Sequence, residues 1–72
     1  EFKEAKAQLE KALEISPDYA AAEIALAAVL RRLGLNQEAI EKLEALSTDN
    51  LSKAEIDKRQ FELGMLYDLE GR

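Results

Sequence analysis

The sequence contains no cysteine and no histidine. Without cysteine, the chain has no disulfide bond, no thiolate metal site and no cysteine nucleophile. Without histidine, it lacks the commonest general base, the commonest zinc ligand and the usual switch near neutral pH. Ser16, Ser47 and Ser52 therefore have no histidine to activate them. We expect no enzyme activity, no metal and no cofactor.

Basic residues and long apolar runs are also scarce. Ten Lys and Arg residues stand against fifteen Asp and Glu residues, which gives a net charge of −5 and a pI near 4.7. Nucleic-acid binding needs a basic face to meet phosphates, so this balance argues against such a partner. No apolar run approaches the roughly 20 residues that span a bilayer, so we expect no membrane insertion. The absence of cysteine is compatible with a location in the cytoplasm, which we favour, and also with the periplasm.

Strong helix formers dominate the residues that are present. Ala and Leu number twelve each and Glu eleven, whereas β-branched residues are sparse. No alternation of apolar and polar residues persists, which argues against strands. The sequence therefore predicts an all-α fold of about four helices, at 2–15, 19–33, 37–46 and 53–70.

Helix ends can be placed from single residues. Pro17 removes a backbone donor and therefore marks a break between helices. Gly34 marks a second break, because it follows a last turn that contains Arg31 and Arg32. Ser52 and Glu55 have the S-x-x-E spacing of a capping box at the start of the last helix. By residue type, Asp18 is expected to cap the second helix and Asn36 the third.

Two patterns of small and apolar residues recur along the chain. The first occurs twice, 34 residues apart, as Ala5-x-x-x-Leu9-x-x-Ala12 and Ala39-x-x-x-Leu43-x-x-Leu46. The second occurs twice, 37 residues apart, as Leu26-Ala27-x-x-Leu30-x-x-x-Gly34 and Leu63-Gly64-x-x-Tyr67-x-x-x-Gly71. Self-similarity at such a period is typical of helical repeat proteins.

These patterns resemble the tetratricopeptide repeat family, in which each repeat is a helix-turn-helix of helices A and B. Leu63, Gly64 and Tyr67 match the helix A pattern. The helix B pattern is matched over the first helix, by Ala5, Leu9, Ala12 and Pro17. The sequence departs from the family at Glu23 and Gln60, where Trp or Tyr is usual, and at Leu46 and Leu51, where Ala and Pro are usual.

The resemblance implies antiparallel repeats stacked as an α-solenoid. Residues 1–72 would then form one segment, with helix B at 1–17, a complete repeat at 20–46 and a further helix A at 52–71. Each repeat of such an array buries its apolar face against its neighbours. We therefore expect a piece of a longer array, whose uncovered terminal helices could promote self-association.

The resemblance further implies a protein-interaction scaffold, in which helix A residues line a concave groove for a peptide or partner helix. The residues that the family register places in this groove are Ile24, Ala28, Arg31, Arg32, Lys58, Phe61, Met65 and Asp68. Family members that clamp acidic C-terminal tails carry Lys and Asn where this chain has Ile24, Ala28, Phe61 and Met65. Capture of a carboxylate tail is therefore not expected.

Alternatives remain at this stage for single residues and for the whole chain. Phe61 and Met65 could instead be core, and Arg31 and Arg32 could serve the C-terminal dipole of their helix. Residues 51–71 are also similar to the final repeat before the catalytic domain of some repeat-containing sulfotransferases. That similarity implies a non-catalytic docking or regulatory segment of a larger enzyme. A third possibility is a spacer that binds no peptide.

Overall fold

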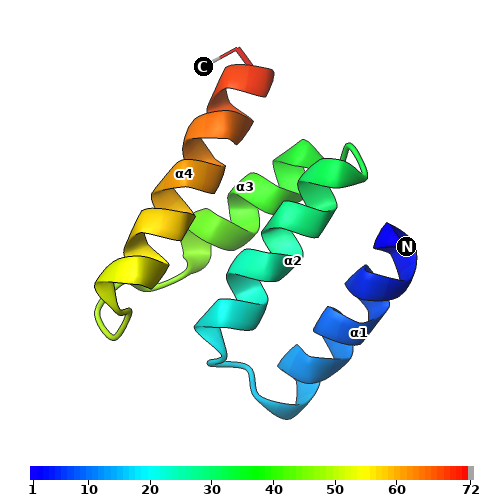
Figure 1. Cartoon of the computed structure of the whole chain (residues 1–72), viewed down its shortest axis with the longest axis vertical. Helices are drawn as coiled ribbons and strands as arrows, with labels where there is room; N and C mark the ends of the chain where they lie inside the picture. Colours follow the sequence, from blue (N-terminus) through cyan, green and yellow to red (C-terminus); the bar gives the residue numbers. More distant parts are fainter. Residues whose placement is uncertain (72) are drawn as a thin grey trace.

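The computed structural model describes residues 1–71 and consists of four α-helices joined by short loops (Figure 1). The helices are α1 (Phe2–Ile15), α2 (Ala20–Arg32), α3 (Asn36–Ala45) and α4 (Lys53–Leu69). Each bound lies within one residue of the bound predicted from the sequence. The all-α class and the number of helices are thus confirmed.

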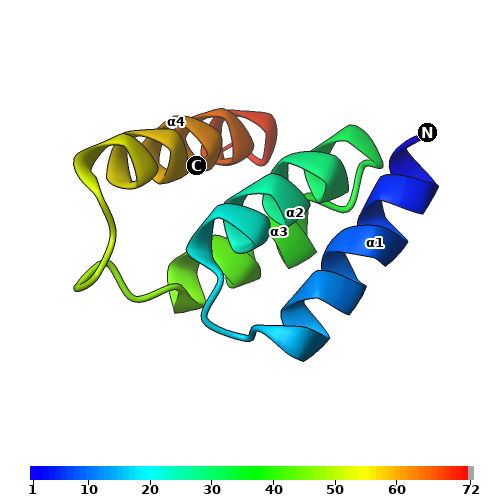
Figure 2. The same ribbon diagram turned by 60° about the horizontal axis from the view of Figure 1, so that its bottom comes forward.

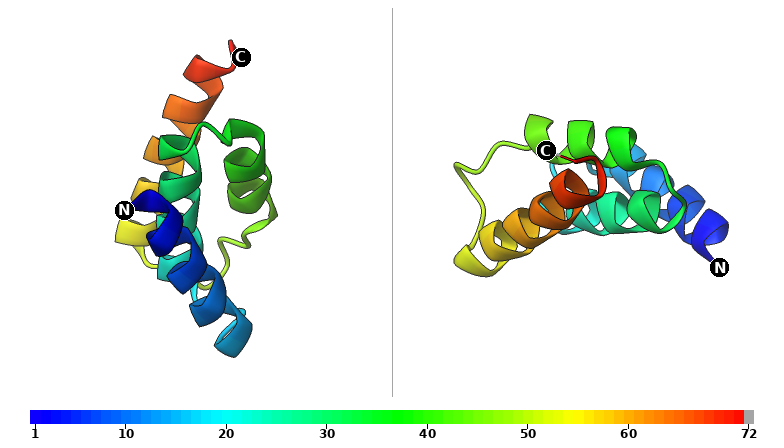
Figure 3. Two further views of the ribbon diagram at one scale, coloured as in Figure 1. Left: turned by 90° about the vertical axis from the view of Figure 1, so that its right-hand side faces the viewer. Right: turned by 90° about the horizontal axis from the view of Figure 1, so that it is seen from above.

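Helix α2 lies at the centre of the molecule and packs against α1, α3 and α4. Consecutive helices run in opposite directions, so α2 and α4 point the same way and lie side by side, with α3 behind them (Figures 1 and 3). Within residues 1–71, α1 contacts no helix other than α2, and it forms the outer edge opposite α4 (Figure 2). The molecule is accordingly flat, measuring 34 × 29 × 17 Å.

The core lies where α2, α3 and α4 meet. Its five largest fully buried side chains are Leu26, Leu30, Ile40, Leu43 and Leu66. Helix α1 contributes no buried residue, although Leu9 and Leu13 pack against the edge of this cluster. Burial of apolar surface, at about 25 cal/mol per Å², is the main stabilising contribution of such a core.

The two predicted breaks have defined backbone geometry. Pro17 and Asp18 are the central residues of a turn that is closed by a hydrogen bond from the Tyr19 amide to the Ser16 carbonyl, 3.1 Å. Gly34 has φ +81°, and the amides of Gly34 and Leu35 donate back into the last turn of α2. This is a Schellman cap, which requires the left-handed conformation that glycine adopts without strain.

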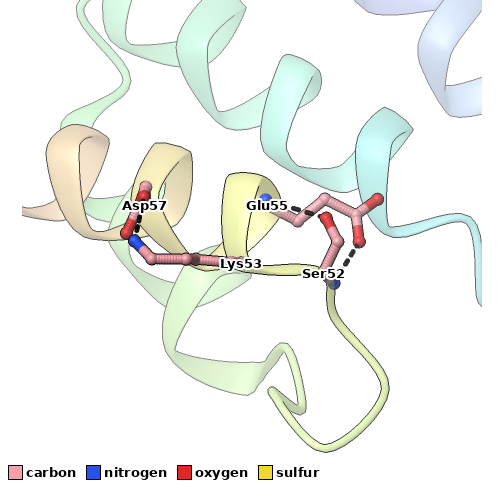
Figure 4. A network of polar contacts seen from close by, with 4 residues as sticks. All are labelled: Ser52, Lys53, Glu55 and Asp57. Carbon is pink, nitrogen blue, oxygen red and sulfur yellow. Dashed lines mark hydrogen bonds and ion pairs between the residues drawn. The ribbon is translucent and has the colours of Figure 1, made fainter.

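The capping box is confirmed, whereas the other two predicted caps are wrong. The Ser52 hydroxyl accepts from the Glu55 amide at 3.1 Å, and the Glu55 carboxylate accepts from the Ser52 amide at 2.9 Å (Figure 4). The residue at the N-cap position of α2 is Tyr19 rather than Asp18, because Asp18 lies inside the turn that contains Pro17. Leu35 precedes α3, and neither Tyr19 nor Leu35 makes a side-chain cap.

Candidate functional site

A groove of about 630 Å³ runs between the N-terminal halves of α2 and α4. We call it the α2–α4 groove, and its lining residues are Ala21, Ile24, Ala25, Ala28, Glu55, Asp57, Lys58, Phe61 and Glu62. Its volume falls within the range of about 300–1,000 Å³ that is usual for ligand pockets in proteins. Most of its inner surface is apolar, and its charged side chains all come from α4.

The floor of the groove comes from the alanine-rich sequence of α2. Leu26, Ala27 and Leu30 face the core, where they are 0–1% exposed. Helical periodicity then turns Ala21, Ala25 and Ala28 toward α4, and Ile24 lies between the floor and the core at 6% exposure. Because three of these four side chains end at Cβ, the space between the two helices stays open.

The wall on α4 is dominated by Phe61, which is 65% exposed. Leu63 and Leu66 on the opposite face of the same helix are buried against α2 and α3. Phe61 lies two residues before Leu63, which on a helix turns it away from the core. A phenyl ring held at the edge of an apolar groove is the kind of exposed apolar surface that marks interaction sites.

The capping box sets the start of α4 and therefore the position of the charged rim. Glu55 is hydrogen-bonded to Ser52, and two residues further on Asp57 pairs with Lys53 at 3.1 Å (Figure 4). Glu62, at the other end of the lined part of α4, forms an ion pair with Arg31 of α2, from Arg31 Nε to Glu62 Oε1 at 2.9 Å. This pair is largely buried, since its side chains are 19% and 12% exposed.

The structure brings four of the eight predicted groove residues together, namely Ile24, Ala28, Lys58 and Phe61. The other four, Arg31, Arg32, Met65 and Asp68, do not line this groove. Arg31 points to Glu62, and the guanidinium of Arg32 lies 5.3 Å from the ring centroid of Phe2 on α1. The two arginines therefore face different neighbours and form no joint anion clamp.

Met65 and Asp68 lie further along α4, beyond the lined part of the groove. Met65 is half-buried and Asp68 is exposed. Tyr67, which matches the helix A pattern, packs against the edge of the core, and its hydroxyl donates to the Glu44 carboxylate on α3.

The predicted groove residues left out several that the structure places there. Ala25, Glu55, Asp57 and Glu62 also line the groove, and a helical spacing of three or four residues from Ala28, Lys58 and Phe61 could have found them. Arg59 on α4 donates from Nε to the carbonyl oxygen of Leu43 at 2.9 Å, so that it satisfies the C-terminal end of α3. No local pattern in the sequence signals this contact, because it joins residues sixteen positions apart.

Other kinds of site find no support among residues 1–71. No three Asp or Glu residues are grouped so that they could hold a metal ion. In the same part of the chain, no helix combines the length and the apolar character that crossing a membrane requires.

Comparison with known proteins gives one match. A family model described as the tetratricopeptide repeat matches residues 1–58, which cover α1, α2, α3 and the first turn of α4. No curated protein and no solved structure matches the chain.

Proposed function

This chain belongs to the tetratricopeptide repeat family, and from that premise we propose that the α2–α4 groove binds an amphipathic helix of a protein partner. Members of the family generally mediate protein–protein interactions and are generally non-catalytic. The proposal concerns what lies in the groove and which residues hold it.

The observation that carries the proposal is the exposure of Phe61 beside an alanine floor. A phenyl ring that is 65% exposed forfeits much of the free energy that its burial would release. A partner side chain resting on Ala25 and Ala28 would contact this ring and exclude water from both surfaces. Aromatic residues in such positions are enriched among the residues that dominate binding energy.

A helix is favoured as the occupant because the groove lies between two parallel helices. Side chains of a third helix at positions i, i+3 and i+7 can enter such a trough as ridges enter a groove. An extended peptide would gain less, since α2 and α4 have no free backbone donors or acceptors along their length for it to pair with. Burial of the partner's apolar face is therefore the main expected source of affinity.

A peptide-display selection against the 72-residue chain tests the proposal. Bound peptides are counter-selected on Ala25→Trp, which fills the groove, and retained on Ala7→Trp, which adds the same side chain to the exposed face of α1. We expect peptides that bind the wild type and Ala7→Trp but lose at least about tenfold in affinity for Ala25→Trp, with apolar residues at helical spacing.

Three outcomes contradict the proposal. Selected peptides that alternate apolar and polar residues indicate an extended occupant. Peptides that bind both tryptophan variants equally place the binding surface elsewhere. A selection that yields no saturable binder indicates a spacer. Melting curves of both variants verify that the fold is retained in each comparison.

A further inference from the structure

The charge on the rim of the α2–α4 groove points to the chemistry of its occupant. We propose that the segment bound there carries a Lys or Arg next to its large apolar side chain, and that Asp57 receives this cation. This inference rests on the proposed function, because it assumes that the groove is the binding site.

Carboxylates outnumber cations among the residues that line the groove. Glu55, Asp57 and Glu62 are acidic, and Lys58 is the one basic side chain among them. The whole chain carries a net charge of −5, so its long-range field also attracts cationic segments. Both the carboxylates in the lining of the groove and the net charge of the chain favour a cationic occupant and oppose an acidic one.

The arginines near the groove do not offset this acidity at its open end. Arg31 is bound to Glu62 at 2.9 Å, and Arg32 lies over Phe2 on the other side of α2. Arg31 therefore neutralises the one rim carboxylate that is nearly buried. What remains toward solvent is Glu55 and Asp57 on the first turns of α4, against one exposed lysine in the lining of the groove, Lys58.

Asp57 is the carboxylate best placed to meet a partner. Its side chain is 65% exposed, whereas Glu62 is 12% exposed and Glu55 is held by the capping box. Asp57 precedes Phe61 by one helical turn, so that a cation at Asp57 and an apolar group at Phe61 can belong to neighbouring residues of one partner. This spacing is the reason for proposing that the partner carries its cation next to its large apolar side chain.

The existing ion pair of Asp57 does not prevent this exchange. Lys53 is its partner in the same helix at i, i+4, and the Lys53 side chain is 89% exposed. Exposed pairs of this kind contribute little to stability, so exchanging Lys53 for a cation of the partner costs little free energy. A second copy of this acidic chain is a poorer occupant, because the two acidic chains would repel each other.

Three indole probes of matched shape separate anchor from charge. Tryptophol is neutral, tryptamine is a cation and indole-3-propionate is an anion at pH 7. Each is titrated into the ¹⁵N-labelled chain, and binding is followed through the amide signals of Ala25, Ala28 and Phe61. We expect saturable binding of tryptophol, about fivefold tighter binding of tryptamine and weaker binding of the anion. The preference for tryptamine should shrink at 0.5 M NaCl, because salt screens exposed charges.

Two variants locate the charge that is responsible. Asp57→Asn should reduce the preference for tryptamine over tryptophol to less than about twofold, because the neutral amide no longer attracts the ammonium group. Glu14→Gln removes one negative charge from an exposed side chain of α1, a helix that does not line the groove, and should leave the preference intact. Because both side chains are on the surface, neither variant is expected to affect folding.

The outcomes distinguish this inference from the proposed function. Equal affinities for the three probes, or a preference that survives in Asp57→Asn, overturn the role of Asp57 and leave the groove as a binding site. The absence of saturable binding for every probe, including tryptophol, contradicts the groove itself. An equal loss of preference in Glu14→Gln and Asp57→Asn assigns the effect to net charge and also overturns the inference.

Discussion

Helices α2 and α4 carry the same sequence pattern in different surroundings. Ala27 in α2 is fully buried, whereas its counterpart Gly64 in α4 is exposed, and a Cβ added there would meet nothing within 4 Å. The reason is the number of neighbours, since α2 contacts three helices and α4 contacts two of those described. The pattern thus specifies a surface that is able to pack closely, and the neighbour determines whether that surface is buried.

The core-facing sides of α2 and α4 are both buried. Substitutions there test this similarity and should have the largest effect on the free energy of unfolding. Leu30 is 1% exposed in α2 and Leu66 is 0% exposed in α4. Leu30→Ala and Leu66→Ala should each lower the free energy of unfolding by about 2–5 kcal/mol, because each leaves a cavity in the core. Urea denaturation measures both values.

Leu69→Ala is the matched control on α4, since Leu69 is 61% exposed. It should change the free energy of unfolding by less than about 0.5 kcal/mol. If Leu66→Ala were as mild as Leu69→Ala, α4 would not be docked on α2 and α3 in solution, and the comparison between the helices would fail.

A larger side chain at Ala27 should have the next largest effect. Ala27 is 0% exposed and belongs to the core cluster where α2 meets α3. Ala27→Leu should destabilise the chain by roughly 1–3 kcal/mol, because the added atoms overpack a close contact between helices. Ala25→Leu, two residues earlier on the exposed face of α2, should be nearly neutral. Equal effects of these two changes in thermal unfolding would show that α2 is not enclosed as described.

Gly64, the exposed counterpart of Ala27 in α4, should respond to a larger side chain with a gain in stability rather than a loss. Gly64 lies within a helix and has space for a methyl group. Gly64→Ala should therefore stabilise the chain by about 0.5–1 kcal/mol, since alanine loses less backbone entropy in a helix. Gly34→Ala is the contrasting glycine, because Gly34 has φ +81° and should lose about 1 kcal/mol or more. A destabilising Gly64→Ala would reveal a surface packed against Gly64 in solution.

The fold was predictable to a large extent because its signals are local. Helix bounds follow from helix-forming residues, from Pro17 and Gly34, and from the capping box at Ser52. The two failed caps show the limit of residue type alone. Asp18 is a good cap by chemistry, but the turn closed from Tyr19 to Ser16 places it one residue too early.

The site was predictable only in part because its charges depend on partners from other helices. Family register placed Ile24 and Phe61 on the same side, and both line the groove. It could not show that Arg31 binds Glu62, a residue thirty-one positions away, or that Arg32 turns toward Phe2. These long-range choices decide which charges remain available on the rim.

Substitutions on the outer face of α4 should have the smallest effect on stability, in contrast to substitutions on its inner face. Phe61 is 65% exposed and Met65 is half-buried, whereas Leu63 between them is 5% exposed. Phe61→Ala loses some apolar contact but gains helix propensity, and the two changes nearly offset each other. We expect Phe61→Ala and Met65→Ala to shift the melting temperature by only a few degrees, since about 1 kcal/mol corresponds to 4–8 °C in a domain of this size.

The same two variants should differ in their effect on binding. Phe61 lines the α2–α4 groove and Met65 does not, so Phe61→Ala should abolish binding of groove-selected peptides while Met65→Ala weakens it less. Leu63→Ala serves as the stability reference and should cost about 2–5 kcal/mol. A loss of that size in Phe61→Ala would show that Phe61 is core in solution. The groove would then have to be sought further along α4, where Met65 and Asp68 lie, and the contrast between the two faces of this helix would have been drawn in the wrong place.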